Sequence, residues 1–327
     1  MLVLGVDSGG AKTICAMVDE KLEVLGAGMA GPSNYHVVGV EQAKKNVGLA
    51  IKRACSVAGL RRKRFDIGCF GMGGLNTERD REIISNFVKS LGVSKEYEIV
   101  NDVVVAYYAV TLGKPGVGVV AGAGSIAYGA DSRGTNATVS GWGWLIGDEG
   151  SAFYIARKAL MHATKAVDGR ASSTKLVELA KKHFGISRFD DIITAVYHDL
   201  ARPKNIASFA ELVSGAAQDG DEAAEKILTD AGKELALSAE TAARKVGITD
   251  QPIIIGGVGG VWQSSIVWGV FKDELKKKLP RVTFREPIEF PVVGALVMGL
   301  SKKGIKISEK DADELENGIR LKLKSKK

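Results

Sequence analysis

Two glycine-rich turns, each set between two apolar strand-like runs, are the segments of this sequence best suited to phosphate chemistry. The first spans residues 5–13, Gly-Val-Asp-Ser-Gly-Gly-Ala-Lys-Thr, and the second spans residues 120–125, Val-Ala-Gly-Ala-Gly-Ser. Backbone without Cβ atoms approaches a phosphate closely and points its N–H groups at the oxygens. Two such hairpins facing each other would hold a nucleoside triphosphate. A single glycine turn is equally an ordinary tight hairpin, but the matched pair favours phosphate binding.

The two turns supply the candidate phosphate-binding residues. Asp7 ends the first apolar run, where a carboxylate could bind Mg²⁺ through water on the β- and γ-phosphates. Lys12 either contacts a phosphate or is a flexible surface lysine, and both interpretations stay open. The full candidate set is Asp7, Gly9, Gly10, Ala11, Lys12, Thr13, Gly122, Ala123, Gly124 and Ser125.

Asp102 is the candidate catalytic residue. It follows a short strand-like run and begins an apolar helical stretch, a place where its carboxylate could accept a proton from a substrate hydroxyl. Asn101 and Asp102 are also both good helix N-caps, so a capping role explains the residue equally well. A base across from a triphosphate matches the needs of phosphoryl transfer, which depends on positioning and charge stabilisation.

The segment 141–151, Gly-Trp-Gly-Trp-Leu-Ile-Gly-Asp-Glu-Gly-Ser, is the other dense group of functional residue types. Indole rings between glycines offer flat faces and N–H donors, and neighbouring carboxylates can bind hydroxyl groups, as in many sugar sites. Alternatively, the tryptophans are core residues and Asp148 or Ser151 caps the next helix. The polar loop 32–36 could supply an amide from Asn34 to the same ligand, and Gly73 a backbone contact, although both segments also fit plain turns.

The elements that must position these residues follow a repeated α/β pattern. The first third reads β-β-β-α-β-α-β-α, with apolar positions at helical spacing from Val40 to Ala58. A turn at 113–116 separates this part from a second strand-turn-strand with a third strand at 137–140. A mostly helical stretch then covers 151–246. The remaining expected elements are strands at 252–255 and 282–285, and helices at 261–279 and 292–300.

We therefore expect two α/β domains with mostly parallel central sheets and a cleft between the domains. The expected boundaries are 1–114 for a smaller domain with the first phosphate loop and Asp102, and 115–305 for a larger domain. Residues 306–327 form an expected amphipathic helix and basic tail of open domain membership. In open α/β sheets, ligands bind beyond the carboxyl ends of strands, where the glycine turns, Asp102 and the turn at 256–260 all fall.

Composition narrows the class of protein. The 327 residues carry a formal net charge of +7, with the excess at 61–64, at 276–278 and from Arg320 onward. No aromatic residues interleave with these basic runs, so solvated surface charge is favoured over nucleic-acid binding. Three scattered cysteines indicate neither disulfides nor a metal site and fit a cytoplasmic setting. No leader and no membrane-spanning apolar run is expected.

Taken together and in order, these motifs resemble the N-acetylglucosamine kinase and archaeal ATP-dependent hexokinase branch of the BadF/BadG/BcrA/BcrD ATPase family. That family lies within the superfamily of actin, heat-shock ATPases and sugar kinases. The resemblance extends to about Leu300 and is most specific at 141–151. It implies a two-domain actin-like fold with duplicated RNase H-like domains, an ATP:sugar phosphotransferase activity with Mg²⁺, and a homodimer.

The resemblance also assigns roles by position. Asp102 becomes the general base, and the sugar is held by Asn34, Trp142, Gly143 and Asp148. The two glycine turns become phosphate loops. Adenosine contacts fall at Ala216, Gly256, Gly257 and Gly259.

Two departures from the family pattern leave alternatives open. Ala11 and Ala123 stand where the family has threonine, and losing each hydroxyl costs on the order of 1 kcal/mol of phosphate binding. A non-catalytic nucleotide-binding sensor is therefore one alternative. A second is an ATPase activator of a 2-hydroxyacyl-CoA dehydratase or benzoyl-CoA reductase, whose iron–sulfur cluster needs cysteines. The scattered Cys15, Cys55 and Cys69 argue against that branch.

Overall fold

The computed structural model describes residues 1–60, 64–199 and 203–324. It divides into two compact units, one of residues 1–114 together with the chain from Ile288 onward, and one of residues 115–287. Residues 288–305 were expected in the second domain, and the domain membership of the tail was open. The structure instead groups both with the first unit, because the apolar helix α12 (Val292–Lys302) packs there.

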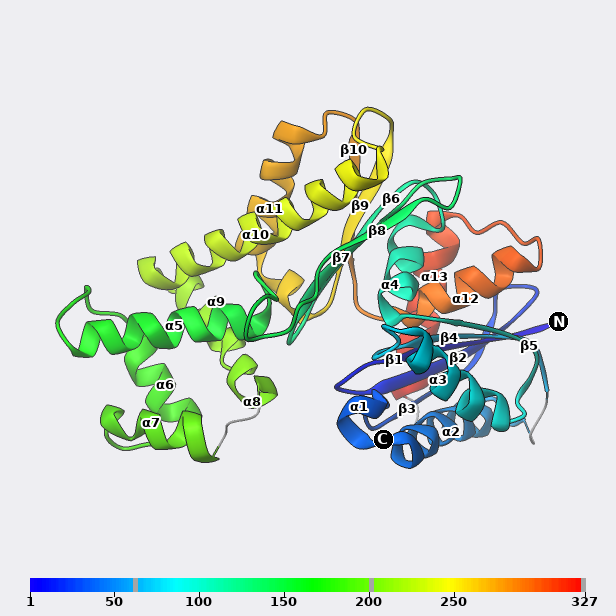
Figure 1. Cartoon of the computed structure of the whole chain (residues 1–327), viewed down its shortest axis with the longest axis horizontal. Coiled ribbons are helices and arrows are strands. Elements are labelled where there is room, and N and C mark those ends of the chain that lie inside the picture. The colour runs from blue at the N-terminus through cyan, green and yellow to red at the C-terminus, as the bar shows by residue number, and fades with distance from the viewer. Residues whose placement is uncertain (61–63, 200–202, 325–327) are drawn as a thin grey trace. The chain divides into compact units, whose positions relative to one another are not determined.

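The first unit is built on a five-stranded sheet in the order β3-β2-β1-β4-β5 (Figure 1). Its strands are β1 (Leu2–Ser8), β2 (Thr13–Asp19), β3 (Val24–Ala30), β4 (Phe65–Met72) and β5 (Ser94–Val100). Strand β2 runs antiparallel to β1 and β3, whereas β1, β4 and β5 are parallel. Strands β1, β3, β4 and β5 therefore all end at one edge of the sheet.

Side chains that alternate along the strands pack against helices on both faces of this sheet. Leu4 and Val6 pack with α2 (Val40–Val57) and α3 (Glu78–Ser90), whereas Val3 points to the opposite face. That second face is covered by α4 (Asp102–Thr111), α12 and α13 (Glu309–Lys324). The predicted order β-β-β-α-β-α-β-α is confirmed, with one short helix, α1 (Tyr35–Val38), that the sequence did not predict.

The second unit repeats this topology. Its sheet order is β10-β9-β6-β7-β8, from β6 (Gly116–Ala121), β7 (Ser125–Ala130), β8 (Asn136–Ser140), β9 (Ile253–Val258) and β10 (Val282–Ile288). Strands β6, β7 and β8 form an antiparallel meander, and β9 pairs parallel to β6. Counted from the meander edge, the strand order matches that of the first unit, which confirms the duplication.

Helices inserted between β8 and β9 enlarge the second unit. The longer ones are α5 (Ala152–Val167), α6 (Leu176–Phe184), α9 (Ala210–Gln218) and α10 (Glu222–Val246). Their apolar faces form one core with Val117 and Val119 of β6. The helix predicted at 261–279 is divided into a short 3₁₀ turn (Gly260–Gln263) and α11 (Ser265–Lys278). Helix α11 begins after Ser264, because the Ser264 side chain caps it by accepting a hydrogen bond from the Val267 amide.

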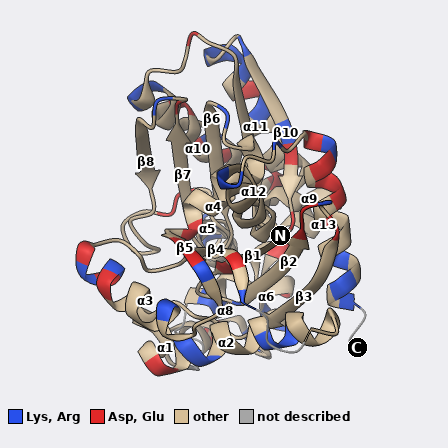
Figure 2. Cartoon of the chain, turned by 90° about the vertical axis from the view of Figure 1, so that its right-hand side faces the viewer, with Lys and Arg blue, Asp and Glu red and all other residues tan. Residues whose placement is uncertain are grey.

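Basic and acidic residues are both found along the helices (Figure 2). In α11, Lys276 and Lys277 lie within 4.0 and 2.7 Å of Asp273 and Glu274. These lysines are thus part of a mixed, solvated surface rather than a basic stripe. The expected basic residues at 61–63 and 325–327 lie outside the described residues. Of the helices that the structure describes, none is both apolar enough and long enough to cross a membrane.

Candidate functional site

In the first unit, the loops that follow β1, β3 and β4 are joined by backbone hydrogen bonds. The Gly73 amide donates to the Ser8 carbonyl at 2.6 Å, and the Ser33 amide donates to the Gly9 carbonyl at 3.3 Å. The Thr13 hydroxyl donates to the Gly31 carbonyl at 2.8 Å, so this candidate phosphate residue is buried and holds the neighbouring loop. The first glycine turn is therefore anchored on both sides.

The tip of the first glycine turn is open to solvent. The Gly9 amide closes the turn on the Lys12 carbonyl at 3.1 Å, and Gly10, Ala11 and Lys12 are exposed. A Cβ atom added at Gly10 would meet nothing within 4 Å. The backbone at this tip is thus accessible to a ligand.

Asp102 stands at the start of α4 with its carboxylate at the same edge. Asn101 is the N-cap of this helix, because its side-chain oxygen accepts from the Val103 amide at 3.0 Å. The capping alternative for Asp102 is therefore unnecessary. Burial raises the pKa of Asp102 to about 6, even though the Val103 and Asp102 amides at the helix start act to lower it.

Asp7, at the end of β1, lies in the same electrostatic environment. Burial, followed by the nearby Asp102 carboxylate, raises the pKa of Asp7 to about 7, and Lys12 acts in the opposite direction. Because the Asp102 carboxylate disfavours ionisation of the half-buried Asp7, a cation beside the two would stabilise the charged pair. Among the described residues, no group of three or more His, Cys, Asp or Glu is gathered to hold a metal ion on its own.

Gly73 brings the first glycine turn and Asp102 together. A Cβ atom at this position would lie 3.0 Å from the Asp102 carboxylate oxygen Oδ2, 3.0 Å from the Ser8 carbonyl and 3.2 Å from the Gly9 Cα atom. A side chain at residue 73 would therefore displace either the carboxylate or the turn. The close packing around residue 73 thus requires a glycine there.

Asn34 lies next to the same loop. Its side-chain oxygen caps α1 by accepting from the His36 amide at 3.0 Å. A Cβ atom at Gly74 would come within 2.6 Å of that oxygen, so the loops after β3 and β4 are in close contact. The structure thus brings Asp7, Gly9, Asn34 and Asp102 to one edge of one sheet.

In the second unit, the glycine turn 122–124 packs against the segment 141–151 and the start of α5. The Ala152 amide donates to the Gly122 carbonyl at 2.8 Å, and the Ser125 hydroxyl donates to the Glu149 carbonyl at 2.7 Å. Ser151 caps α5 through the Tyr154 amide, as one of the sequence alternatives proposed. Ala123 is exposed at the tip, like Ala11 in the first unit.

Asp148 lies close to this turn. It has a φ of 55°, is 9% exposed, and accepts a hydrogen bond from the Gly143 amide at 3.3 Å. A Cβ atom at Gly124 would lie 2.6 Å from its Oδ2 atom. Burial raises the pKa of Asp148 above its ordinary value. Trp142 is 76% exposed, so it is not a core residue of its unit.

The residues proposed for adenosine fall into two groups. Gly259, with a φ of 116°, lies against the second glycine turn, since an added Cβ atom would meet the Ala121 carbonyl at 2.4 Å. Gly256 and Gly257 are buried in β9, and Gly257 packs on the Trp262 indole. Ala216, on α9, is 2% exposed and lies in the core of the second unit. Gly259 thus lies beside the second glycine turn, and Gly256 and Gly257 lie in the strand that leads to it.

Sequence reasoning missed the residues that hold the loops of the first unit in place. The Asn101 amide group donates to the Leu75 carbonyl at 3.0 Å, and Ser8 and Ser33 share a hydrogen bond of 2.5 Å between their hydroxyls. Asp80 joins the loops after β3 and β4. Thr77-x-x-Asp80 is a readable capping box, but the partners of its second oxygen are distant in the sequence.

The chain is similar to proteins of one known family and to two sugar kinases. A model of the BadF/BadG/BcrA/BcrD ATPase family matches residues 4–299. The chain is 29% identical over 301 residues to the N-acetylmuramic acid/N-acetylglucosamine kinase of Clostridium acetobutylicum, covering 92% of this chain and 98% of that protein. It is also 29% identical over 315 residues to the N-acetyl-D-glucosamine kinase of Dictyostelium discoideum, with 92% and 98% covered.

A solved structure shows the same fold. The crystal structure of a candidate N-acetylglucosamine kinase from Chromobacterium violaceum superposes with a TM-score of 0.72 at 23% identity, covering 91% of this chain and 98% of that one. The two matching five-stranded sheets and this likeness confirm the predicted duplicated, actin-like α/β fold.

Proposed function

This chain belongs to the BadF/BadG/BcrA/BcrD ATPase family, and on that premise we propose that it is an ATP-dependent sugar kinase. Its proposed substrate is N-acetylglucosamine or a related hexose or hexosamine, as the names of the two relatives suggest. The observation that carries the proposal is the Asp102 carboxylate. Asn101, not Asp102, caps helix α4, and the pKa of Asp102 lies near the range useful to a general base.

In the proposed reaction, Asp102 accepts the proton of one sugar hydroxyl as that oxygen attacks the γ-phosphorus of ATP. The bond between the γ-phosphorus and the bridging oxygen breaks, so the products are the sugar phosphate and ADP. Proton acceptance by a positioned carboxylate contributes roughly 10²- to 10⁴-fold in rate. The half-buried setting of Asp102 raises its proton affinity, which suits this role.

The glycine turns are the proposed phosphate contacts, through backbone N–H groups at their exposed tips. Asp7 is the proposed Mg²⁺ contact, directly or through water, since Mg²⁺ with a nucleotide needs few protein carboxylates. The cation would neutralise charge on the phosphates, and it fits the paired carboxylates Asp7 and Asp102. Proposed sugar contacts are Asn34 in the first unit, and Trp142, Gly143 and Asp148 in the second.

The chemistry of the cysteines disfavours the alternative of a dehydratase or reductase activator. Cys15 and Cys69 are fully buried inside β2 and β4, and Cys55 is half-buried in α2. Burial raises the pKa of each thiol, which opposes the thiolate form that binds iron. Free thiols also agree with the proposed cytoplasmic location. A homodimer is proposed from the family resemblance alone, and sedimentation would test it.

ADP release coupled to an optical assay, measured over a panel of sugars with ATP and Mg²⁺, tests the proposal. We expect turnover that depends on sugar and is fastest with N-acetylglucosamine or a related hexosamine. ADP release that is independent of every sugar would favour an ATPase activator. Nucleotide binding without ADP release would favour a sensor.

A further inference from the structure

Asp80 uses its two carboxylate oxygens for two different purposes. One oxygen, Oδ2, accepts from the Asn76 and Thr77 amides at 2.9 and 2.7 Å, while the Thr77 hydroxyl accepts from the Asp80 amide at 3.2 Å. These contacts form a capping box at the start of α3. The capping box accounts fully for Oδ2 and leaves Oδ1 to be explained.

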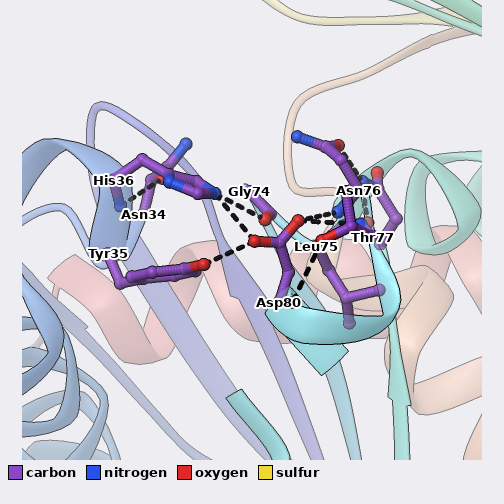
Figure 3. Close-up of polar contacts among 9 residues, drawn as sticks. Asn34, Tyr35, His36, Gly74, Leu75, Asn76, Thr77 and Asp80 are labelled. Atoms are coloured by element: carbon purple, nitrogen blue, oxygen red, sulfur yellow. Dashed lines mark hydrogen bonds and ion pairs between the residues drawn. The ribbon is translucent and has the colours of Figure 1, made fainter. Parts of the chain in front are cut away.

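The other oxygen, Oδ1, faces the loop after β3. The Tyr35 hydroxyl donates to it in a short hydrogen bond, and the His36 ring atom Nε2 lies 3.1 Å away (Figure 3). Nε2 also lies 3.2 Å from the Gly74 carbonyl. Because a carbonyl and a carboxylate both accept, Nε2 carries the proton that His36 shares between them.

These contacts connect the proposed sugar contact to the proposed base. Asn34 directly precedes Tyr35 and caps the short helix that carries Tyr35 and His36. On the other side, Asn76 and Leu75 accept hydrogen bonds from the Asn101 amide group at 3.3 and 3.0 Å. Asn101 in turn begins the helix whose first residue is Asp102. Polar contacts therefore connect Asn34 through His36, Asp80 and Asn76 to Asn101, the residue directly before Asp102.

The burial of Asp80 makes this connection stiff. Its side chain is 6% exposed, although His36 is 48% exposed. The Tyr35 hydroxyl is the main cause that holds the pKa of Asp80 well below its usual range, and the backbone donors of the capping box act in the same direction. A buried carboxylate that stays ionised keeps all of its donors in place, because releasing any of them leaves negative charge unpaired.

We propose that Asp80, acting through Oδ1, is a positioning residue that holds the Asn34 loop against Asp102 and thereby sets the affinity for the sugar. The inference rests on the proposed kinase function and extends it to a residue that contacts no reacting atom. The alternative is that Asp80 only caps α3, and that Tyr35 and His36 contact it without affecting the sugar affinity.

Paired variants separate the two roles of Asp80. The double variant Tyr35→Phe with His36→Ala removes the donors to Oδ1 and leaves the capping box intact. The matched control Thr77→Ala weakens the capping box and leaves the donors to Oδ1 in place. Each protein is assayed for KM and kcat with sugar and with ATP, and for its melting temperature. The single variant Tyr35→Phe serves if the double variant does not fold.

We expect the double variant to raise the sugar KM by about tenfold, the effect of losing hydrogen bonds to a charged group. The KM for ATP should change by less than about twofold, since the first glycine turn is untouched. Thr77→Ala should lower the melting temperature yet leave both KM values unchanged. Replacing His36→Ala by His36→Gln in the double variant, which keeps an N–H donor, should restore part of the sugar affinity that the double variant loses.

Equal sugar KM values in the wild type and in the Tyr35→Phe and double variants would overturn the positioning role. A rise in sugar KM of the same size in Thr77→Ala would also overturn it, because the effect would then follow α3 stability. Wild-type turnover tests the proposed function separately. A wild-type protein that phosphorylates no sugar refutes the kinase and, with it, this extension, whereas an active wild type with unaffected variants refutes the extension alone.

Discussion

The Asp102 carboxylate is predicted to destabilise the folded protein at neutral pH. Folding raises its pKa from 3.8 to about 6, chiefly through burial. At about 1.4 kcal/mol per pH unit, this difference amounts to about 3 kcal/mol, which solvent contact reduces to about 1–3 kcal/mol. Asp102→Asn, which has the same shape and no charge, should therefore have a larger free energy of unfolding at pH 8 than the wild type.

The pH dependence gives this prediction its sign. Because the folded state holds the Asp102 proton more tightly than the unfolded chain, the penalty is full above about pH 6 and disappears below about pH 4. At pH 4.5 the advantage of Asp102→Asn should fall to about a third of its value at pH 8. Urea titration at both pH values measures it.

A matched control is Asp273→Asn, at a carboxylate that is 72% exposed on α11. Its effect on the free energy of unfolding should remain small at both pH values. The prediction is wrong if Asp102→Asn is no more stable than the wild type at pH 8, or if its stability advantage is the same at pH 4.5. Burial would then not be the cause that raises the pKa of the Asp102 carboxylate.

The remaining predictions concern packing, phosphate binding and pH. Gly294→Ala places a Cβ atom 1.9 Å from the Val105 carbonyl, and should cost about 1–3 kcal/mol of stability and displace α4, whereas Gly48→Ala, with its nearest neighbour at 3.6 Å, should not lower the melting temperature. Ala11→Thr adds a hydroxyl at the exposed tip of the first turn and should lower the KM for ATP about fivefold. An unchanged KM would show that residue 11 does not contact the phosphates. Sugar-dependent kcat/KM should fall about tenfold per pH unit below about pH 6, as the base becomes protonated, and a flat profile between pH 5 and pH 7 would contradict that role for Asp102.

Local patterns made the elements of this fold predictable. The strands of both sheets appear as short apolar runs between glycine and polar turns, and helix α2 was found within one residue of its observed end at Val57. Strand ends also predicted that the first glycine turn and Asp102 lie at one edge of a sheet. These features depend on residues close together in the sequence.

Features that depend on tertiary contacts were not predictable. Nothing in the residues 292–300 indicates that this apolar helix packs on Val3 and Val105 of the first unit rather than on the strand it follows. The donors to Asp80 lie 44 and 45 residues before it, so its second role appears only in the fold. The assignment of the cap to Asn101, which leaves Asp102 as the proposed base, also needed the observed hydrogen bond, because both residues cap helices well.

Turnover of Asp102→Asn in the presence of ATP, Mg²⁺ and saturating sugar tests the central claim most directly. Calorimetry on the same protein would show whether sugar and nucleotide still bind. A general base at residue 102 predicts that kcat falls roughly 10²- to 10⁴-fold while both dissociation constants change little. Turnover within about twofold of the wild type, with binding intact, would contradict it.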